Sequence, residues 1–247
     1  IIYCVIYEKI SKFYEGYNGR KCVIGYSFRG KEIYAMHVGS PTGRQFISTY
    51  AIHGREWITA KLALKHIKIG VKKGGGWIIP LVNPDGAAIS EDIRPMWKAN
   101  ARGVDLNCNF DADWGSGRLN TKRRGAENCI GDFPFSESET KALKEFTQKI
   151  RPFATLSFHT KGEEIYWQYN GQGDERGAKI LAEATGYKPV LIYGSAGGYK
   201  DWCIQKLNIP AYTVECGADG LEHPITDIQD LKKCYNALKI FMDNYAE

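Results

Sequence analysis

Short apolar runs alternate with amphipathic stretches along the chain, and together they predict strands that alternate with helices. The apolar runs are rich in β-branched and aromatic residues and lie between turn signals, which is typical of buried strands. The strands predicted in this way cover residues 22–25, 33–38, 46–52, 77–82, 154–158, 190–192 and 211–215. Apolar residues at helical spacing predict helices over residues 6–14, 57–68, 136–150, 176–185, 199–207 and 227–245. This order predicts an α/β sandwich in which loops at strand ends form the functional site.

Two segments between these elements have their own signals. Asn83-Pro84-Asp85-Gly86 predicts a turn, and Ser136-Glu137-Ser138-Glu139 predicts a capping box that opens the following helix. Between them, residues 90–135 show almost no regular pattern and are dominated by Gly, Asn, Arg and Asp. A loop of that length inside a compact domain usually carries function.

Length and composition bound the class of protein. The chain of 247 residues is 43% hydrophobic and contains no linker of Gly, Ser or Pro, so we expect one domain over residues 1–247. The net charge is only +5, and Lys and Arg are scattered among acids, which argues against a nucleic-acid partner. No apolar run approaches the roughly 18 residues of a transmembrane segment.

The compartment is open at this point. Residues 1–7 are apolar but too few for a signal peptide, and no basic segment precedes them. The chain does not begin with Met, so a leader removed from a secreted or cell-wall-associated protein stays an alternative. The seven cysteines are an odd number without CxxC spacing, so at least one thiol is free. That count favours a reducing, cytoplasmic compartment.

The candidate chemistry lies at the ends of three predicted strands. One strand ends at His53, and Glu56 follows three residues later; the others end at His159 and Glu215. Imidazole nitrogen and carboxylate oxygen bind zinc at about 2 Å, and catalytic zinc sites use three protein ligands so that water can occupy a fourth position. Taken singly, His159 is a core histidine and Glu215 a surface charge. Their coincidence with the long polar loop favours a joint site.

Six motifs in one order then resemble a known family, the zinc metallocarboxypeptidases related to carboxypeptidase A. The motifs are His53-Gly-Arg-Glu56, Asn83-Pro84-Asp85-Gly86, Gly103-Val104-Asp105-Leu106-Asn107-x-Asn109-Phe110, Phe135-Ser136-Glu137-x-Glu139, Ser157-Phe158-His159 and Tyr212-Thr213-Val214-Glu215. The resemblance implies a single-domain α/β/α sandwich with a mixed, mostly parallel central sheet and helices on both faces. It implies one Zn²⁺ held by His53, Glu56 and His159. Glu215 becomes the general base, and Asp105 fixes the tautomer of His53.

The chain departs from the family where substrate is held. Digestive and regulatory members have an arginine after the asparagine that corresponds to Asn107, and the two grip the substrate's C-terminal carboxylate; this chain has Cys108. The family's electrophilic arginine falls on Lys98, and an additional Arg102 precedes Gly103. The block from Trp97 to Asn107 is similar to bacterial γ-D-glutamyl-diaminopimelate peptidases.

A tyrosine completes the expected substrate site. Tyr193 falls where the family has a mobile loop tyrosine that closes over substrate, although a packed loop aromatic is an equal alternative. We therefore predict that Lys98 is catalytic and that Arg102, Asn107 and Tyr193 bind substrate.

The expected function is zinc-dependent hydrolysis of peptidoglycan stem peptides, with a peptide or muropeptide as partner and a monomeric chain. A general carboxypeptidase, in which Arg102 replaces the lost arginine, is the first alternative. A non-catalytic peptide-binding relative is the second.

Overall fold

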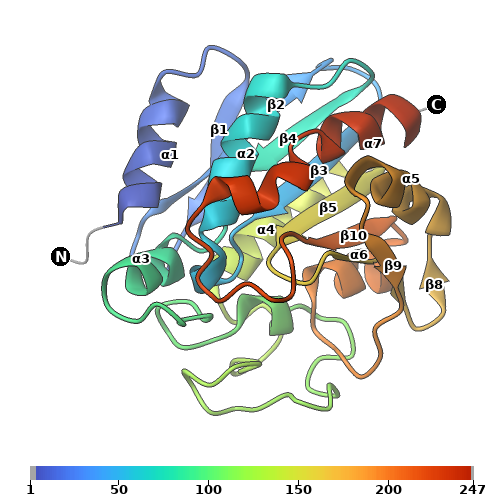
Figure 1. The fold of residues 1–247 in the computed structure, drawn as a ribbon. Helices are drawn as coiled ribbons and strands as arrows, with labels where there is room; N and C mark the ends of the chain where they lie inside the picture. Colours follow the sequence, from blue (N-terminus) through green and yellow to red (C-terminus); the bar gives the residue numbers. More distant parts are fainter. Residues whose placement is uncertain (1–3, 246–247) are drawn as a thin grey trace.

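A central sheet forms the middle layer of the computed structural model, which describes residues 4–245 (Figure 1). The first three residues of the apolar N-terminus and the last two residues of the predicted domain lie outside that range. The sheet has eight strands. In spatial order they are β1 (Lys21–Tyr26), β2 (Glu32–Gly39), β4 (Gly75–Ile79), β3 (Gln45–Tyr50), β5 (Ala154–His159), β10 (Ala211–Glu215), β6 (Glu164–Tyr166) and β9 (Lys188–Val190). A separate small hairpin consists of β7 (Gln168–Tyr169) and β8 (Gln172–Gly173).

The four central strands β4, β3, β5 and β10 are mutually parallel. Strands β6 and β9 are also parallel, whereas β1–β2, β2–β4 and β10–β6 pair in antiparallel fashion. The prediction of a mixed, mostly parallel sheet is therefore confirmed. Because β3, β5 and β10 run in the same direction, their carboxyl ends meet at one edge, where ligands bind in such sheets.

Helices cover both faces of this sheet, which confirms the predicted sandwich. One face packs against α1 (Val5–Glu15), α2 (Ile58–Ile69), α5 (Glu175–Thr185) and α7 (Ala237–Tyr245), and the other against α4 (Ser138–Ile150) and α6 (Tyr199–Leu207). Strand β2 shows why two cores form: Tyr34 and Met36 point to the first, and Ile33 and Ala35 to the second. Alternate side chains of a strand point to opposite faces, so a strand buried on both sides is apolar throughout.

The segment predicted as a turn at residues 83–86 begins a helix instead. Helix α3 (Pro84–Asp92) starts at Pro84, and the Asn83 Oδ1 atom accepts a hydrogen bond from the Gly86 N–H at 2.8 Å. Asparagine before proline suits an N-cap as well as a turn, because proline lacks the N–H that a first helical residue leaves unpaired. The turn prediction was wrong for that reason.

The predicted capping box of α4 does not form. The helix begins at Ser138, and its cap residue Glu137 makes no side-chain capping bond. Ser136 Oγ instead donates to Glu137 Oε1 at 2.7 Å and accepts from the side chain of Asn109 at 3.0 Å. The Ser136 hydroxyl, which would cap the helix in such a box, is therefore engaged in hydrogen bonds within the preceding loop.

The helix predicted over residues 227–245 is interrupted. A 3₁₀ helix, Ile228–Cys234, precedes the α-helix Ala237–Tyr245. The carbonyl of Cys234, which a continuous helix would use internally, accepts a hydrogen bond from His66 Nε2 of α2 at 2.8 Å. A tertiary contact therefore replaces one helical hydrogen bond at the break.

The long segment between α3 and α4 contains little regular structure, as predicted; its main element is a 3₁₀ turn, Leu106–Cys108. Two buried asparagines hold its backbone. Asn100 Oδ1 accepts from the N–H groups of Arg102 and Val104, both at 3.0 Å. Asn109 Nδ2 donates to the carbonyls of Ile130 at 2.9 Å and Phe133 at 3.1 Å. In this segment, asparagine side chains therefore satisfy backbone N–H and C=O groups that in helices and strands are paired with other backbone groups.

The structure also describes the length of the helices and the state of the cysteines. No helix within residues 4–245 is long and apolar enough to cross a membrane. All seven cysteines are free thiols, and six of them are buried.

Buried His66 gives the fold a pH-dependent stability. Its Nδ1 accepts a hydrogen bond from Tyr50 at 2.5 Å, and burial lowers the pKa of its imidazole to about 4. The unfolded chain has the ordinary histidine pKa of about 6.5, so it binds more protons between these values. The free energy of unfolding should therefore fall by about 1.4 kcal/mol per pH unit as pH decreases from about 6.5 towards 4.

The measurement is denaturant unfolding of the metal-free protein at several pH values, for wild type and His66→Gln. The variant should be less stable at pH 7 but should show a shallower pH dependence. An unchanged pH dependence would contradict the assignment to His66.

Candidate metal centre and active site

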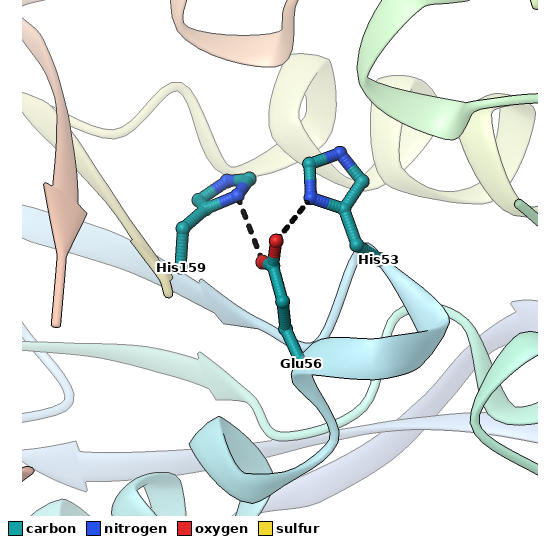
Figure 2. Close-up of side chains that lie close together, drawn as sticks. All are labelled: His53, Glu56 and His159. Carbon is teal, nitrogen blue, oxygen red and sulfur yellow. Dashed lines mark hydrogen bonds and ion pairs between the residues drawn. The ribbon is translucent and has the colours of Figure 1, made fainter. Parts of the chain in front are cut away.

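Three side chains that can bind metal converge at the edge where the central strands end (Figure 2). His53 lies just beyond β3 and caps a single 3₁₀ turn, Gly54–Glu56, which carries Glu56. His159 is the last residue of β5, the parallel neighbour of β3. Backbone pairing of two strands therefore sets the spacing of the histidines.

The geometry of these side chains fits a metal ion. Glu56 Oε1 lies 2.8 Å from His53 Nδ1, and Oε2 lies 3.1 Å from His159 Nδ1. One candidate ligand atom from each residue lies within 4.8 Å of the others, and all three residues are at most 5% exposed. The contact between Glu56 Oε2 and His159 Nδ1 does not have hydrogen-bond geometry, so this buried oxygen is left with an ion-pair contact only, a cost that a bound cation would remove. Burial tends to raise the pKa of Glu56, but both histidines hold it below its usual range, as a metal ligand requires.

A glycine allows the metal-binding turn to pack closely. A Cβ atom at Gly54 would lie 2.5 Å from the carbonyl oxygen of Gly86 and 2.7 Å from that of Trp97. Gly54 N–H also donates to the Lys98 carbonyl at 2.9 Å. Only glycine fits there, so the His-Gly-Arg-Glu turn is fixed against α3 and the long loop.

Asp105 lies on the far side of the His53 ring, as expected for a partner that fixes its tautomer. Its Oδ1 is 3.2 Å from His53 Nε2, and its Oδ2 is 2.8 Å from Lys98 Nζ. Burial alone would raise the pKa of Asp105, but the charges of Lys98 and His53 hold it well below its usual value. With Nε2 directed to Asp105, Nδ1 is the atom left for a metal.

Removing this contact should weaken metal binding. Asp105→Asn keeps the shape but loses the charge that orients the imidazole, so we expect about a 10–100-fold loss of zinc affinity. Competition with a chelator of known affinity measures the effect. Asp132→Asn is the control, because Asp132 is an exposed carboxylate paired with Arg102 and Arg124. Equal zinc affinity in both variants would contradict the predicted role of Asp105.

Glu215 ends β10 directly beside His159, since the two are partners in the parallel pairing of β10 and β5. Its carboxyl group lines the cavity next to the triad. Burial, opposed by the charge of His159 and reinforced by that of Glu56, raises the pKa of Glu215 to about 7. A carboxyl group with a pKa near neutrality can both accept and return a proton at neutral pH.

His53, His159 and Glu215 line a cavity of about 390 Å³. One wall consists of Lys98, Asp105, Asn107 and Cys108 from the long loop. The other wall is the segment 192–196, whose Tyr193 lines the cavity and is 74% exposed.

The two walls join at a glycine. A Cβ atom at Gly197 would lie 2.6 Å from the Cys108 carbonyl oxygen, and the Gly197 carbonyl accepts from the Phe110 N–H at 2.9 Å. Tyr193 is thus carried by a segment that is anchored at its base.

Arg102 is the one predicted site residue that the structure places elsewhere. Its guanidinium lies 3.4 Å from Asp132 and 3.6 Å from Glu137, over the ring of Phe28, and it does not line the cavity. The Asn100 side chain accepts a hydrogen bond from the Arg102 N–H and holds the backbone there, and the Arg102 side chain lies outside the cavity lining. This geometry does not support a substrate contact for Arg102.

Asn107 and Cys108 do lie at the cavity. Asn107 Oδ1 accepts from the Tyr199 N–H at 3.0 Å, which fixes the amide against the start of α6. Burial raises the pKa of the Cys108 thiol well above its usual value, so the sulfur stays protonated and neutral. A neutral thiol cannot attract a carboxylate as a guanidinium does.

Three charged residues of the cavity were not assigned from the sequence. Arg118 lies in the long loop, whereas Lys200 and Asp201 lie in the first turn of α6. The sequence feature that could have identified Lys200 and Asp201 is a Lys-Asp pair at the start of a predicted helix, followed by the apolar residues Trp202, Cys203 and Ile204. A charged pair at buried helix positions is unusual and calls for an explanation.

The family model described as "Zinc carboxypeptidase" matches residues 6–185, which include the triad and most of the sheet. A γ-D-glutamyl-L-diamino acid endopeptidase 1 of Lysinibacillus sphaericus is 28% identical over 89% of this chain and 65% of its own length. The zinc carboxypeptidase of Simulium vittatum is 28% identical over 83% of this chain and 82% of its own. This chain thus spans about two thirds of the length of the first relative.

Solved structures show the same fold. Bovine thrombin-activatable fibrinolysis inhibitor, in complex with a tick carboxypeptidase inhibitor, superposes with a TM-score of 0.82 at 21% identity and covers 97% of this chain and 94% of its own. The murein-tripeptide amidase MpaA of Escherichia coli O157 superposes with a TM-score of 0.65 at 23% identity, covering 95% and 94%. At these identities the likeness bears on the fold alone.

Proposed function

This chain belongs to the zinc carboxypeptidase family, and from that membership we propose that it is a zinc-dependent peptidase of peptidoglycan stem peptides. The bond proposed is the amide between γ-D-glutamate and diaminopimelate. The substrate is therefore a peptide or muropeptide, and the cofactor is one zinc ion held by His53, Glu56 and His159.

The chemistry follows from the positions of the side chains. Zinc, when bound, lowers the pKa of a coordinated water to about 7 and polarises the scissile carbonyl. Glu215, half-buried beside His159, takes a proton from the attacking water and returns it to the nitrogen of the leaving amine. Lys98 places a positive charge on the cavity wall, where it stabilises the developing oxyanion.

One observation carries the substrate class: the neutral Cys108 thiol lies beside Asn107 on the cavity wall. A substrate with an ordinary C-terminal residue would lose its charge-assisted contact there, at a cost of about 1.5–3 kcal/mol. This agrees with the name of the Lysinibacillus sphaericus relative, a γ-D-glutamyl-L-diamino acid endopeptidase.

The experiment compares two substrates on the wild-type enzyme. A γ-D-glutamyl-diaminopimelate stem peptide should be hydrolysed about 10–150-fold faster than a matched peptide with C-terminal Phe, Leu or Lys, the factor that the lost contact corresponds to. Mass detection of the products identifies the bond. Cys108→Arg should raise the rate on the ordinary peptide. Equal wild-type rates on both substrates would refute the cell-wall specificity.

A general carboxypeptidase is the second candidate, and one observation favours it. Arg118 lines the cavity and is exposed, so its guanidinium is available to a plain C-terminal carboxylate. In that case Arg118→Ala would abolish hydrolysis of ordinary peptides that the wild type cleaves well. A non-catalytic relative is disfavoured because the metal triad and Glu215 are all present.

A further inference from the structure

Outside the cavity, arginine and aromatic side chains form a surface patch that the proposed mechanism does not use. The guanidinium of Arg102 lies 5.5 Å from the centre of the Phe28 ring, and that of Arg94 lies 5.3 Å from the centre of the Trp97 ring. The arginine–aromatic patch, as we call it, consists of Phe28, Arg29, Arg94, Trp97, Arg102 and Arg124. None of these residues, all within the described range 4–245, is part of the cavity lining.

Contacts along the long loop make the patch continuous. Arg124 Nη1 donates to the Arg102 carbonyl at 3.1 Å, and Arg124 Nη2 lies 2.7 Å from Asp132, which also pairs with Arg102. A Cβ atom at Gly125 would lie 3.3 Å from the Trp97 ring. Residues 124–125 therefore join the two arginine–ring pairs into one surface.

The patch is positively charged and open to solvent. Arg29 and Arg94 are exposed and form no ion pair within residues 4–245. The other two arginines of the patch share Asp132, and one of them also lies 3.6 Å from the buried Glu137. Four guanidinium groups thus face two carboxylates, and the Phe28 ring beside them is 56% exposed. Such a surface attracts anions, and arginine and aromatic residues are enriched where proteins bind partners.

The chemistry of the patch fits an acidic polysaccharide. A guanidinium matches the planar, two-oxygen geometry of a carboxylate, and an exposed aromatic ring offers an apolar face to the C–H groups of a sugar ring. Peptidoglycan presents both groups, because its sugar strand carries stem peptides with free carboxylates. The patch is also adjacent to the cavity, since Lys98 of the cavity wall follows Trp97 directly and precedes Arg102 by four residues.

We propose that the arginine–aromatic patch holds polymeric peptidoglycan while a stem peptide of the same strand enters the cavity. A sugar ring packs against Phe28, and carboxylates of neighbouring stem peptides accept hydrogen bonds from the arginines. The proposal deepens the proposed function and rests on it for the identity of the polymer. It places Arg102 at the polymer and away from the scissile bond.

The first test measures binding without hydrolysis, in a Glu215→Gln background that keeps zinc. The protein is sedimented with insoluble diaminopimelate-type peptidoglycan that has been freed of other wall polymers. A triple variant, Arg29→Gln with Arg94→Gln and Arg124→Gln, should bind about tenfold more weakly, because each exposed ion pair contributes up to about fivefold. Raising the salt from about 0.05 M to about 0.5 M should weaken binding of the protein without these substitutions, since exposed charges are screened.

Three other exposed arginines provide a matched control. Arg20, Arg44 and Arg176 also lie over aromatic rings but outside the patch, so their triple change to glutamine alters the net charge equally. This control should bind peptidoglycan like the unsubstituted protein. Phe28→Ala should weaken binding without any change of charge. Equal binding by the two triple variants would overturn the proposal, and so would binding to duplex DNA that is as tight as binding to peptidoglycan.

The second test compares two substrates on enzymes that retain Glu215. The patch triple variant should hydrolyse a soluble γ-D-glutamyl-diaminopimelate stem peptide at the wild-type rate. It should release product from limiting insoluble peptidoglycan about tenfold more slowly than wild type and than the control triple variant. A purely structural role of the arginines would lower both rates by the same factor, and that result would overturn the proposal.

The same measurements separate this proposal from the proposed function. Hydrolysis of the soluble stem peptide, together with equal rates of all variants on the polymer, would support the proposed bond and overturn the role of the patch. Hydrolysis of neither substrate, together with binding to peptidoglycan that depends on the patch, would refute the proposed function and support the patch. Failure of both hydrolysis and binding would overturn both.

Discussion

Replacing Glu215 with glutamine is expected to lower kcat by at least about 10²–10⁴-fold, the contribution of general acid–base catalysis. Glutamine keeps the shape of the side chain but cannot accept the proton of the attacking water. Zinc content should stay at about one equivalent, since Glu215 is outside the group of three residues that can hold a metal. Steady-state kinetics and metal analysis on the same preparation separate the two effects.

Glu164→Gln is the matched control for this prediction. Glu164 lies on β6 opposite Glu215 in the antiparallel pairing, and its Oε2 accepts a hydrogen bond from Tyr166. It does not line the cavity, so its neutral variant should retain most of the activity. Near wild-type turnover in Glu215→Gln would show that another residue is the base.

Loss of a metal ligand is expected to have a still larger effect. His159→Ala leaves His53 and Glu56, two protein ligands where catalytic zinc sites use three, so zinc content should fall from about one equivalent to almost none. The loss should exceed the roughly 10–100-fold expected for partners that only orient a ligand. Activity should fall with the metal. Metal analysis after gel filtration measures the stoichiometry.

A neighbouring histidine tests whether that loss is specific. His223 is close enough to Glu56 and His53 to be affected by their charges but lies outside the triad. His223→Ala should therefore retain one zinc. Stoichiometric zinc in His159→Ala would refute the ligand set.

The sequence predicted the sheet and the convergence of the metal triad because both depend on buried strands. Strands β3, β5 and β10 are covered on both faces, so they appear as apolar runs, and the residue at the end of each run must lie at the same edge. That argument predicts that His53, His159 and Glu215 lie at one edge of the sheet, whereas their roles as metal ligands and base came from the family resemblance. Strands β6, β7 and β8 have two or three residues each, too few for a pattern, and were missed.

Positions in the long loop could not be predicted in the same way. Arg102 was expected at the substrate because it is an additional arginine before Gly103 in a chain that has Cys108 where the family has an arginine. The Asn100 side chain instead turns the backbone, so neighbours along the chain point in different directions. The break before α7 has a similar cause, since a contact with His66 decides it. Periodicity reports which face of an element is buried but does not report such side-chain contacts to backbone.

The buried asparagines of the long loop also bear on how the cavity moves. Because Asn100 and Asn109 each hold several backbone groups at once, the wall that carries Lys98 and Asn107 is expected to open only as a cooperative unit, with slow amide hydrogen exchange. The other wall, segment 192–196, presents Tyr193 to solvent and is tied to the long loop through the Arg118 N–H and the Gly194 carbonyl at 2.9 Å, so we expect it to fluctuate more easily. Substrates of different size would then be accommodated by displacement of the segment 192–196. The wall that carries Lys98 and Asn107 would keep its position relative to the metal centre.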